Sequence, residues 1–121
     1  MIAMASRTSS MGASFRFRVS DAVDVPHRGM LLRLRLMEGT PSIADLRPGR
    51  YLLLRSPDGV ERWVRVLDFA IVGGRATQAR LERTRELDIV ISQADAHRDG
   101  RAIEIGWQVV ATAASAGERA A

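Results

Sequence analysis

Residues 15–36 read FRFRVSDAVDVPHRGMLLRLRL, and the two ends of this stretch decide the fold class. Arginine alternates with an apolar residue over residues 15–19 (FRFRV) and again over residues 32–36 (LRLRL). A period of two is typical of a β-strand that has one face on an apolar core and the other in water. Both segments therefore predict half-buried strands.

Similar segments recur along the chain. A short apolar run covers residues 51–54, a mixed run covers 63–67, and further runs cover 88–92 (DIVIS) and 103–111 (IEIGWQVVA). Strands at roughly 8–12-residue spacing with turns between them predict an all-β barrel or sandwich. The turn signals are SPDG at residues 56–59, Gly73-Gly74, and Asp99-Gly100 before the last run.

Residues 76–87 (ATQARLERTREL) fit two interpretations. Thr77, Ala79 and Leu81 alternate as in a strand, whereas the many good helix formers in the segment favour a helix. We expect a strand followed by a turn, with a helix as the alternative.

Composition excludes several classes of protein. The chain of 121 residues has no cysteine, which excludes disulfides, thiolate metal sites and cysteine nucleophiles. All 18 basic residues are arginine, so Schiff-base chemistry and a P-loop lysine are excluded as well. No apolar run approaches the ~18 residues that cross a bilayer. We expect no membrane partner and a cytoplasmic location.

The order of the turns and strands is informative in itself. Residues 25–29 (VPHRG) come directly before a long strand candidate at 30–37, which ends in EGT at 38–40. Residues 87–91 (LDIVI) are followed by a glycine turn and then by the run at 103–111. This order resembles the β-barrel second domain of translation GTPases of the elongation factor Tu type, in which an I-P-G-R-G turn leads into a long strand that ends in a glycine.

The resemblance implies a small, closed or nearly closed antiparallel β-barrel over residues 15–111. Residues 1–14 and 112–121 have little apolar bulk, so we expect them to be flexible tails. In that family the barrel contacts tRNA ends or ribosomal RNA. The sequence departs from the pattern because His27 stands where glycine is usual and residues 39–49 form a longer connection. It also has no G-x-x-x-x-G-K-[ST] motif, so we expect no nucleotide hydrolysis.

Arginine is concentrated in the first part of the chain. Residues 1–35 carry six arginines and two aspartates, and the remaining residues carry twelve arginines and twelve acids, so the net charge of +4 lies in the first part. Because the apolar residues of both alternating segments are expected to face the core, four arginines share one outer face. Like charges opposite one another destabilise a sheet, so this arginine face invites an anionic partner or interleaved acids, for which Asp21, Asp24, Glu61 and Glu104 are candidates. The arginine face consists of Arg16, Arg18, Arg33 and Arg35.

We predict a non-catalytic binding module without a cofactor, which contacts RNA or another polyanion through the arginine face. Phosphate is the expected chemistry because arginine makes bidentate, charge-assisted contacts to it. The alternative is a protein-interaction or self-assembly subunit that contacts an acidic protein surface or a second copy and uses Trp63 or Trp107 at the interface. The expected anion-binding residues are Arg16, Arg18, Arg28, Arg33 and Arg35, with Arg28 at the rim.

Catalytic and metal signals are weak. Asp95, His97 and Asp99 form D-x-H-x-D, which could place oxygen and nitrogen ligands around a metal. The neighbouring Arg98 and Arg101 would repel a cation, and no G-x-S-x-G motif frames a serine. We therefore expect no metal site and no enzymatic activity.

Overall fold

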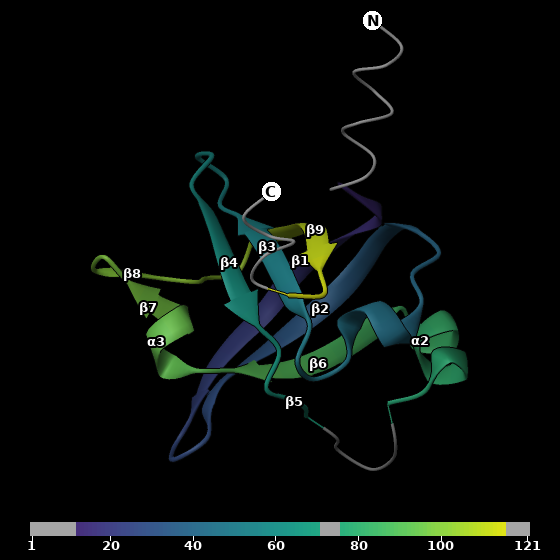
Figure 1. The fold of residues 1–121 in the computed structure, drawn as a ribbon, viewed down its shortest axis with the longest axis horizontal. Coiled ribbons are helices and arrows are strands. Elements are labelled where there is room, and N and C mark those ends of the chain that lie inside the picture. Colours follow the sequence, from purple (N-terminus) through teal and green to yellow (C-terminus); the bar gives the residue numbers. More distant parts are fainter. Residues whose placement is uncertain (1–11, 71–75, 116–121) are drawn as a thin grey trace, which may run out of the picture.

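One strongly curved sheet dominates the protein (Figure 1). The computed structural model describes residues 12–70 and 76–115. Within these residues, seven strands form the sheet in the order β4-β3-β9-β1-β2-β6-β5, and every neighbouring pair is antiparallel, which confirms the all-β prediction. The strands of the sheet are β1 (Gly12–Val25), β2 (Gly29–Gly39), β3 (Tyr51–Arg55), β4 (Glu61–Arg65), β5 (Asp68–Phe69), β6 (Glu86–Ile91) and β9 (Gln108–Ala113). The other elements are the ribbon of β7 (His97–Arg98) and β8 (Arg101–Ala102) and the helices η1 (Ile43–Leu46), α2 (Gln78–Thr84) and α3 (Gln93–Ala96).

β1 and β2 have the alternation that the sequence predicts. Phe17 and Leu34 are fully buried, whereas Arg18 and Arg33 are exposed. The pairing of the two strands shifts by one residue around Ser20, which is therefore the extra residue of a β-bulge. Its hydroxyl lies 3.2 Å from the carbonyl oxygen of Arg33, to which it donates. The bulge brings Asp21, rather than Ser20, opposite Arg33.

The turn at residues 25–29 fixes how β1, β2 and β6 meet. The N–H of Arg28 donates to the carbonyl oxygen of Val25 at 3.0 Å, and His27 has a φ of 66°, as at the third position of a type II turn. Gly29 has a φ of 128°, and a Cβ at this position would collide with the carbonyl oxygen of Ile91 in β6. Only glycine lets β2 approach β6 this closely.

Residues 56–59 form the predicted turn between β3 and β4, with the N–H of Gly59 donating to the carbonyl oxygen of Ser56 at 3.0 Å. The chain then passes directly from one edge strand to the other, because only residues 66–67 separate β4 from β5. The N–H of Leu67 donates to the carbonyl oxygen of Val90 in β6 at 2.8 Å. The sheet is therefore curled so far that one short segment joins its two edge strands.

The inside of the curled sheet is the hydrophobic core. Inward residues of the strands fill it, together with Leu46 of η1 and Leu81 of α2. Gln78 of α2 donates to the carbonyl oxygen of Pro41 at 2.9 Å and accepts from the N–H of Ile43 at 2.7 Å. These two bonds fix α2 against η1, which places both buried leucines on the same core.

The prediction of a strand followed by a turn at residues 76–87 is wrong. Residues 78–84 form α2, and the strand begins only at Glu86. Thr77 caps the helix, since its hydroxyl accepts from the N–H of Arg80 at 3.1 Å. Leu81 is the buried residue of the helix, so one apolar anchor replaces the alternating face that the strand prediction required.

The predicted strand at residues 103–111 begins too early. The strand in this region is β9, which runs over Gln108–Ala113. Directly before it the chain turns, because the N–H of Trp107 donates to the carbonyl oxygen of Glu104 at 3.3 Å and Gly106 has a φ of 103°. Glycine readily adopts the positive φ that this turn requires. The part of the apolar run before Gln108 is therefore not part of the strand.

The remaining expectations concern a turn and the two ends. Asp99 and Gly100 both have a positive φ and form the turn between β7 and β8 rather than leading into β9. β1 begins inside the segment expected as an N-terminal tail, and β9 extends into the one expected as a C-terminal tail. The rest of these segments, residues 1–11 and 116–121, and the expected Gly73-Gly74 turn lie outside the described residues.

Candidate functional site

β1 and β2 are neighbours, and their outward residues place the four arginines of the arginine face on one side of the sheet. Acids interleave with these arginines, but most of them are not the acids that the sequence suggested. Exposed ion pairs of this kind contribute about 0–1 kcal/mol each, so they neutralise charge more than they stabilise the fold. The ion pairs are Arg16 with Glu38 at 3.3 Å, Arg28 with Asp68 at 3.6 Å, Arg33 with Asp88 at 2.9 Å and Arg35 with Glu86 at 3.7 Å.

Arg33 has the best-formed of these pairs. Its guanidinium donates to both carboxylate oxygens of Asp88, at 2.9 and 3.1 Å, and Asp21 lies opposite it on β1. The hydrogen bonds and charge of Asp88 raise the pKa of Arg33 above its ordinary value. The guanidinium of Arg33 is therefore already bonded to an acid of its own chain. Another acid suggested by the sequence, Asp24, lies 3.6 Å from Nε2 of His97.

Arg18 differs from the other predicted arginines. Its side chain is exposed, and within the described residues it has no carboxylate partner. It lies directly opposite Arg35 on β2 and opposite Gln108 on β9. Two positive charges face each other across β1 and β2, an arrangement that destabilises a sheet unless an anion lies between them.

These positions belong to a continuous row of directly opposite residues on the outer side of the sheet. It crosses six strands, and we call it the outer row. Arg55 and Gln108 join it only because β9 lies between β3 and β1, so the sequence reasoning missed both of them. From β4 to β6 the outer row reads Glu61, Arg55, Gln108, Arg18, Arg35 and Glu86.

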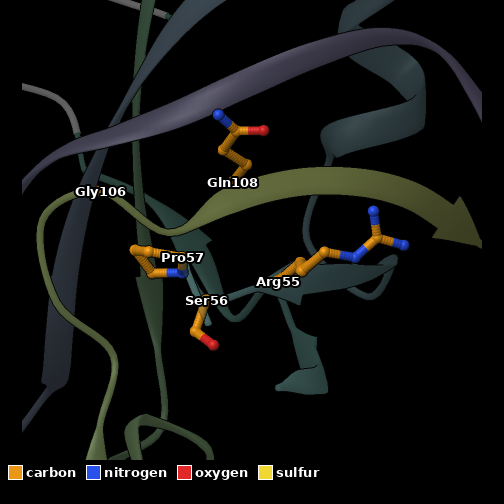
Figure 2. Close-up of a pocket in the computed structure, with 5 residues that line it drawn as sticks. All are labelled: Arg55, Ser56, Pro57, Gly106 and Gln108. Carbon is orange, nitrogen blue, oxygen red and sulfur yellow. The ribbon is translucent and has the colours of Figure 1, made fainter. Parts of the chain in front are cut away.

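A half-open hollow of roughly 260 Å³ lies beside this row, next to Arg55 and Gln108 (Figure 2). Pro57 and Gly106 form its apolar part. The hydroxyl of Ser56 also lines it, but this group already accepts from the N–H of Val60 at 2.9 Å and donates to a neighbouring carboxylate. Arg55 donates to Glu61 through Nε at 2.8 Å and through Nη2, so the amide of Gln108 is the remaining polar side-chain group that lines the hollow.

The two tryptophans proposed for a protein interface lie in different environments. Trp107 is 1% exposed, and the guanidinium carbons of Arg62 and Arg101 lie over its ring, 5.2 and 5.4 Å from the centroid. It therefore offers no surface to a partner. Trp63 is half-buried on the outer side of β4, opposite Leu53 on β3.

Arg62 is a buried structural residue, 6% exposed. Burial lowers its pKa from the ordinary value, and four backbone carbonyl oxygens accept its hydrogen bonds. Two of these carbonyls belong to Asp95 and Ala96 of α3, and the other two belong to Arg98 and Arg101 of the β7–β8 ribbon. Arg62 therefore attaches this region to β4.

The D-x-H-x-D segment is used in the fold in another way. One carboxylate oxygen of Asp95 lies 2.7 Å from Arg98, and the other accepts from the backbone N–H of Arg65 at 2.9 Å. Over residues 12–70 and 76–115, no group of three or more histidine or acidic side chains is arranged to hold a metal. None of the helices in the same part of the chain is long and apolar enough to cross a membrane.

Comparison with known proteins gives no match: no protein-family model, no curated protein and no solved structure matches this chain.

Proposed function

We propose that this protein is a non-catalytic cytoplasmic module that binds RNA or another polyanion through the outer side of its sheet. The observation that carries the proposal is the pair of opposite arginines, Arg18 and Arg35, with no carboxylate partner for Arg18 among the described residues. A phosphate group between the two guanidinium groups would replace their repulsion by two charge-assisted contacts. Arginine suits this task because its planar fork matches the geometry of a phosphate.

We also propose that the fold is a nearly closed barrel of the type found as the second domain of elongation factor Tu-like GTPases. The connection of β4 to β5 supports this, because these two strands are the opposite edges of the sheet and residues 66–67 alone join them. The turn before β2 gives further support, because the residue in the position where the family has glycine, His27, has a positive φ. A module of this type without a GTPase motif would act by binding alone.

The ion pairs on the outer side narrow the proposed contact. Four of the five arginines predicted to bind an anion have an intramolecular acid, so the contact centres on Arg18. Arg35 is 59% exposed and lies 3.7 Å from Glu86, which is a loose pair that a phosphate can displace. Arg33 is excluded from the centre of the contact because it lies between Asp21 and Asp88, and the side chain of Asp88, which accepts both of its hydrogen bonds, is only 16% exposed.

Fluorescence anisotropy of a labelled single-stranded RNA, titrated with the full chain at low and at physiological salt, tests the proposal. We expect micromolar binding at low salt that weakens steeply as salt is added, because each neutralised phosphate of a single strand contributes about 0.7 to the slope of log K against log salt. Absence of binding at low salt would overturn the proposal.

A second candidate function is protein interaction through Trp63. The observation in its favour is that Trp63 and Leu53 lie opposite each other and half-buried on the outer side of β3 and β4, where they form a small apolar area. Such a contact would survive moderate salt and would be lost in Trp63→Ser. Sedimentation velocity of the wild type and of this variant tests the self-assembly form, in which only the wild type forms a larger species.

A further inference from the structure

The outer row is bounded by acids at both ends. Its middle carries Arg55, Gln108, Arg18 and Arg35, while Glu61 stands at one end and Glu86 at the other. Each glutamate also pairs with the nearest arginine: Glu61 accepts from Nε of Arg55 at 2.8 Å and from its Nη2, and Glu86 lies 3.7 Å from Arg35. Both pairs are exposed, with the side chains of Glu61 and Glu86 43% and 39% exposed, so a phosphate can displace them. Positive charge is thus confined to a short central section.

The neighbouring rows do not widen this positive section. On one side, Arg33 lies between Asp21 and Asp88, so two acids flank one arginine. On the other side, Leu53 and Trp63 are apolar, and Arg16 of β1 is paired with Glu38 at 3.3 Å. A duplex presents two lines of phosphates, and the second line would meet either the acids or the apolar pair. A single line of phosphates fits the outer row alone.

The curvature of the sheet also favours a flexible ligand. The outer row runs across the strands, which is the direction in which the sheet curls (Figure 1). A DNA duplex has a persistence length of about 150 base pairs, and a similarly stiff helix could not follow a surface that turns within a few strands. A single strand can bend to follow it.

We propose that the ligand is single-stranded RNA whose backbone crosses the strands along the outer row, over Arg35, Arg18, Gln108 and Arg55. This inference rests on the proposed function and adds the direction, the strandedness and the length of the contact. With strands about 4.8 Å apart, the four positions span roughly 14 Å, which is room for about three phosphates. Three arginine contacts give a slope of log K against log salt of about −2.

Titration of labelled oligouridylates of 6, 12 and 20 nucleotides at several salt concentrations tests this footprint. We expect the slope of log K against log salt to be about −2 for all three lengths. The longer oligonucleotides extend past the outer row, so their additional phosphates contact none of its arginines. The number of binding registers rises with length and changes the affinity, but it leaves the slope unchanged. A duplex of the same sequence length should bind more weakly than the single strand.

Two matched arginine variants locate the contact. Arg18 and Arg83 are both exposed, and within the described residues neither has a carboxylate partner, but Arg83 lies on α2 and is not a member of the outer row. Arg18→Gln should weaken binding of the 20-mer about tenfold and reduce the slope by about 0.7, whereas Arg83→Gln should change the affinity less than twofold. Glu86→Gln should strengthen binding, which a folding defect could not imitate, because it frees Arg35.

The outcomes separate the inference from the proposed function. If the 20-mer binds but the slope grows with length, or the duplex binds as tightly, or Arg18→Gln behaves like Arg83→Gln, the single-row contact is wrong while polyanion binding stands. If the wild type binds none of the oligonucleotides at low salt, both are wrong. Equal slopes with loss at Arg18 and gain at Glu86 support both.

Discussion

At the scale of single residues, backbone geometry separates two glycines that look alike in the sequence. Gly29 and Gly59 both have a positive φ, 128° and 94°, which costs a residue with a side chain about 1 kcal/mol. A Cβ at Gly29 would also collide with the carbonyl oxygen of Ile91, whereas the space around Gly59 is open. Substitutions at the two positions therefore separate the free-energy cost of the positive φ, which both share, from the cost of the steric contact, which only Gly29 has.

We expect Gly59→Ala to lower the free energy of unfolding by about 1 kcal/mol and Gly29→Ala to lower it by about 3 kcal/mol, because only the second forces β2 away from β6. Urea denaturation of both variants measures the difference. Equal losses would contradict the close approach of the two strands at Gly29.

His27 gives a prediction of the opposite sign. It adopts a φ of 66° in the turn before β2, where glycine carries no steric penalty. We expect His27→Gly to raise the free energy of unfolding by about 1 kcal/mol. The control is Arg28→Gly, at the next position and without a positive φ, which should lower it. Thermal denaturation of both variants checks the pair of signs, and a destabilised His27→Gly would contradict the turn geometry.

At the scale of elements, Arg62 is the link between β4 and the region from α3 to β8. Its guanidinium donates to four backbone carbonyl oxygens at 3.0–3.2 Å and lies over the ring of Trp107. We expect Arg62→Met to lower the free energy of unfolding by about 3 kcal/mol, because these carbonyls lose their donor in a buried place. Arg65→Gln, an exposed change on the same strand, should cost less than about 0.5 kcal/mol. Similar losses in urea denaturation would mean that Arg62 is not the link.

A second link joins the turn between β3 and β4 to the same ribbon. Arg101 donates to both carboxylate oxygens of Asp58, at 2.7 and 2.9 Å, and the hydroxyl of Ser56 lies 2.6 Å from the same group. Chiefly through the bonds of Arg101, and next through that of Ser56, the pKa of Asp58 lies well below its ordinary value. A carboxyl with a lower pKa in the folded than in the unfolded state stabilises the fold above its unfolded-state pKa, and this contribution is lost as the pH falls.

Asp58→Asn should therefore lower the free energy of unfolding at pH 7. The difference between the wild type and the variant should shrink as the pH falls below about 5, where the carboxyl of the unfolded chain begins to take up its proton. Urea titrations at pH 7, 4 and 3 measure this difference. A constant difference over this range would show that Asp58 acts only through the shape of the turn.

Local periodicity predicts β1, β2 and the turn at 56–59 correctly, because each depends on residues close in sequence. It fails at residues 76–87, where apparent alternation coincides with a helix that is capped by Thr77 and anchored by Leu81. It also carries the last strand through Gly106, although the chain turns there. In both places a tertiary contact or a special φ outweighs the pattern.

The candidate site shows the same limit. Alternation is enough to place four arginines on one outer face, because the period of a strand fixes which residues point outward. It cannot supply their partners, since Asp88 lies 55 residues from Arg33 along the chain. Arg55 and Gln108 belong to the outer row only through the strand order, which no local pattern contains.

At the scale of the whole molecule, the net charge of +4 does not indicate where an anion would bind. Most arginines of the predicted face are neutralised by acids from neighbouring strands, so the outer side is a mosaic of both signs rather than a basic field. We therefore expect weak long-range attraction of a polyanion, so the affinity of the proposed contact would depend on local geometry at Arg18. This is why salt slope, rather than affinity alone, is the informative quantity.

The continuity of the sheet gives the last prediction. The N–H of Leu67 donates to the carbonyl oxygen of Val90 at 2.8 Å and thereby joins the segment after β4 to β6. If the two edges separate easily, this amide exchanges through a local opening of low free energy. If the curled sheet opens only as a unit, the Leu67 amide exchanges with the same free energy as the slowest amides of β1 and β2, within about 1 kcal/mol.

We expect the second result from native-state hydrogen exchange, because residues 66–67 are too few to let β4 and β5 separate without pulling on β3 and β6. Much faster exchange at Leu67 would show an open sheet and would remove the main support for the barrel.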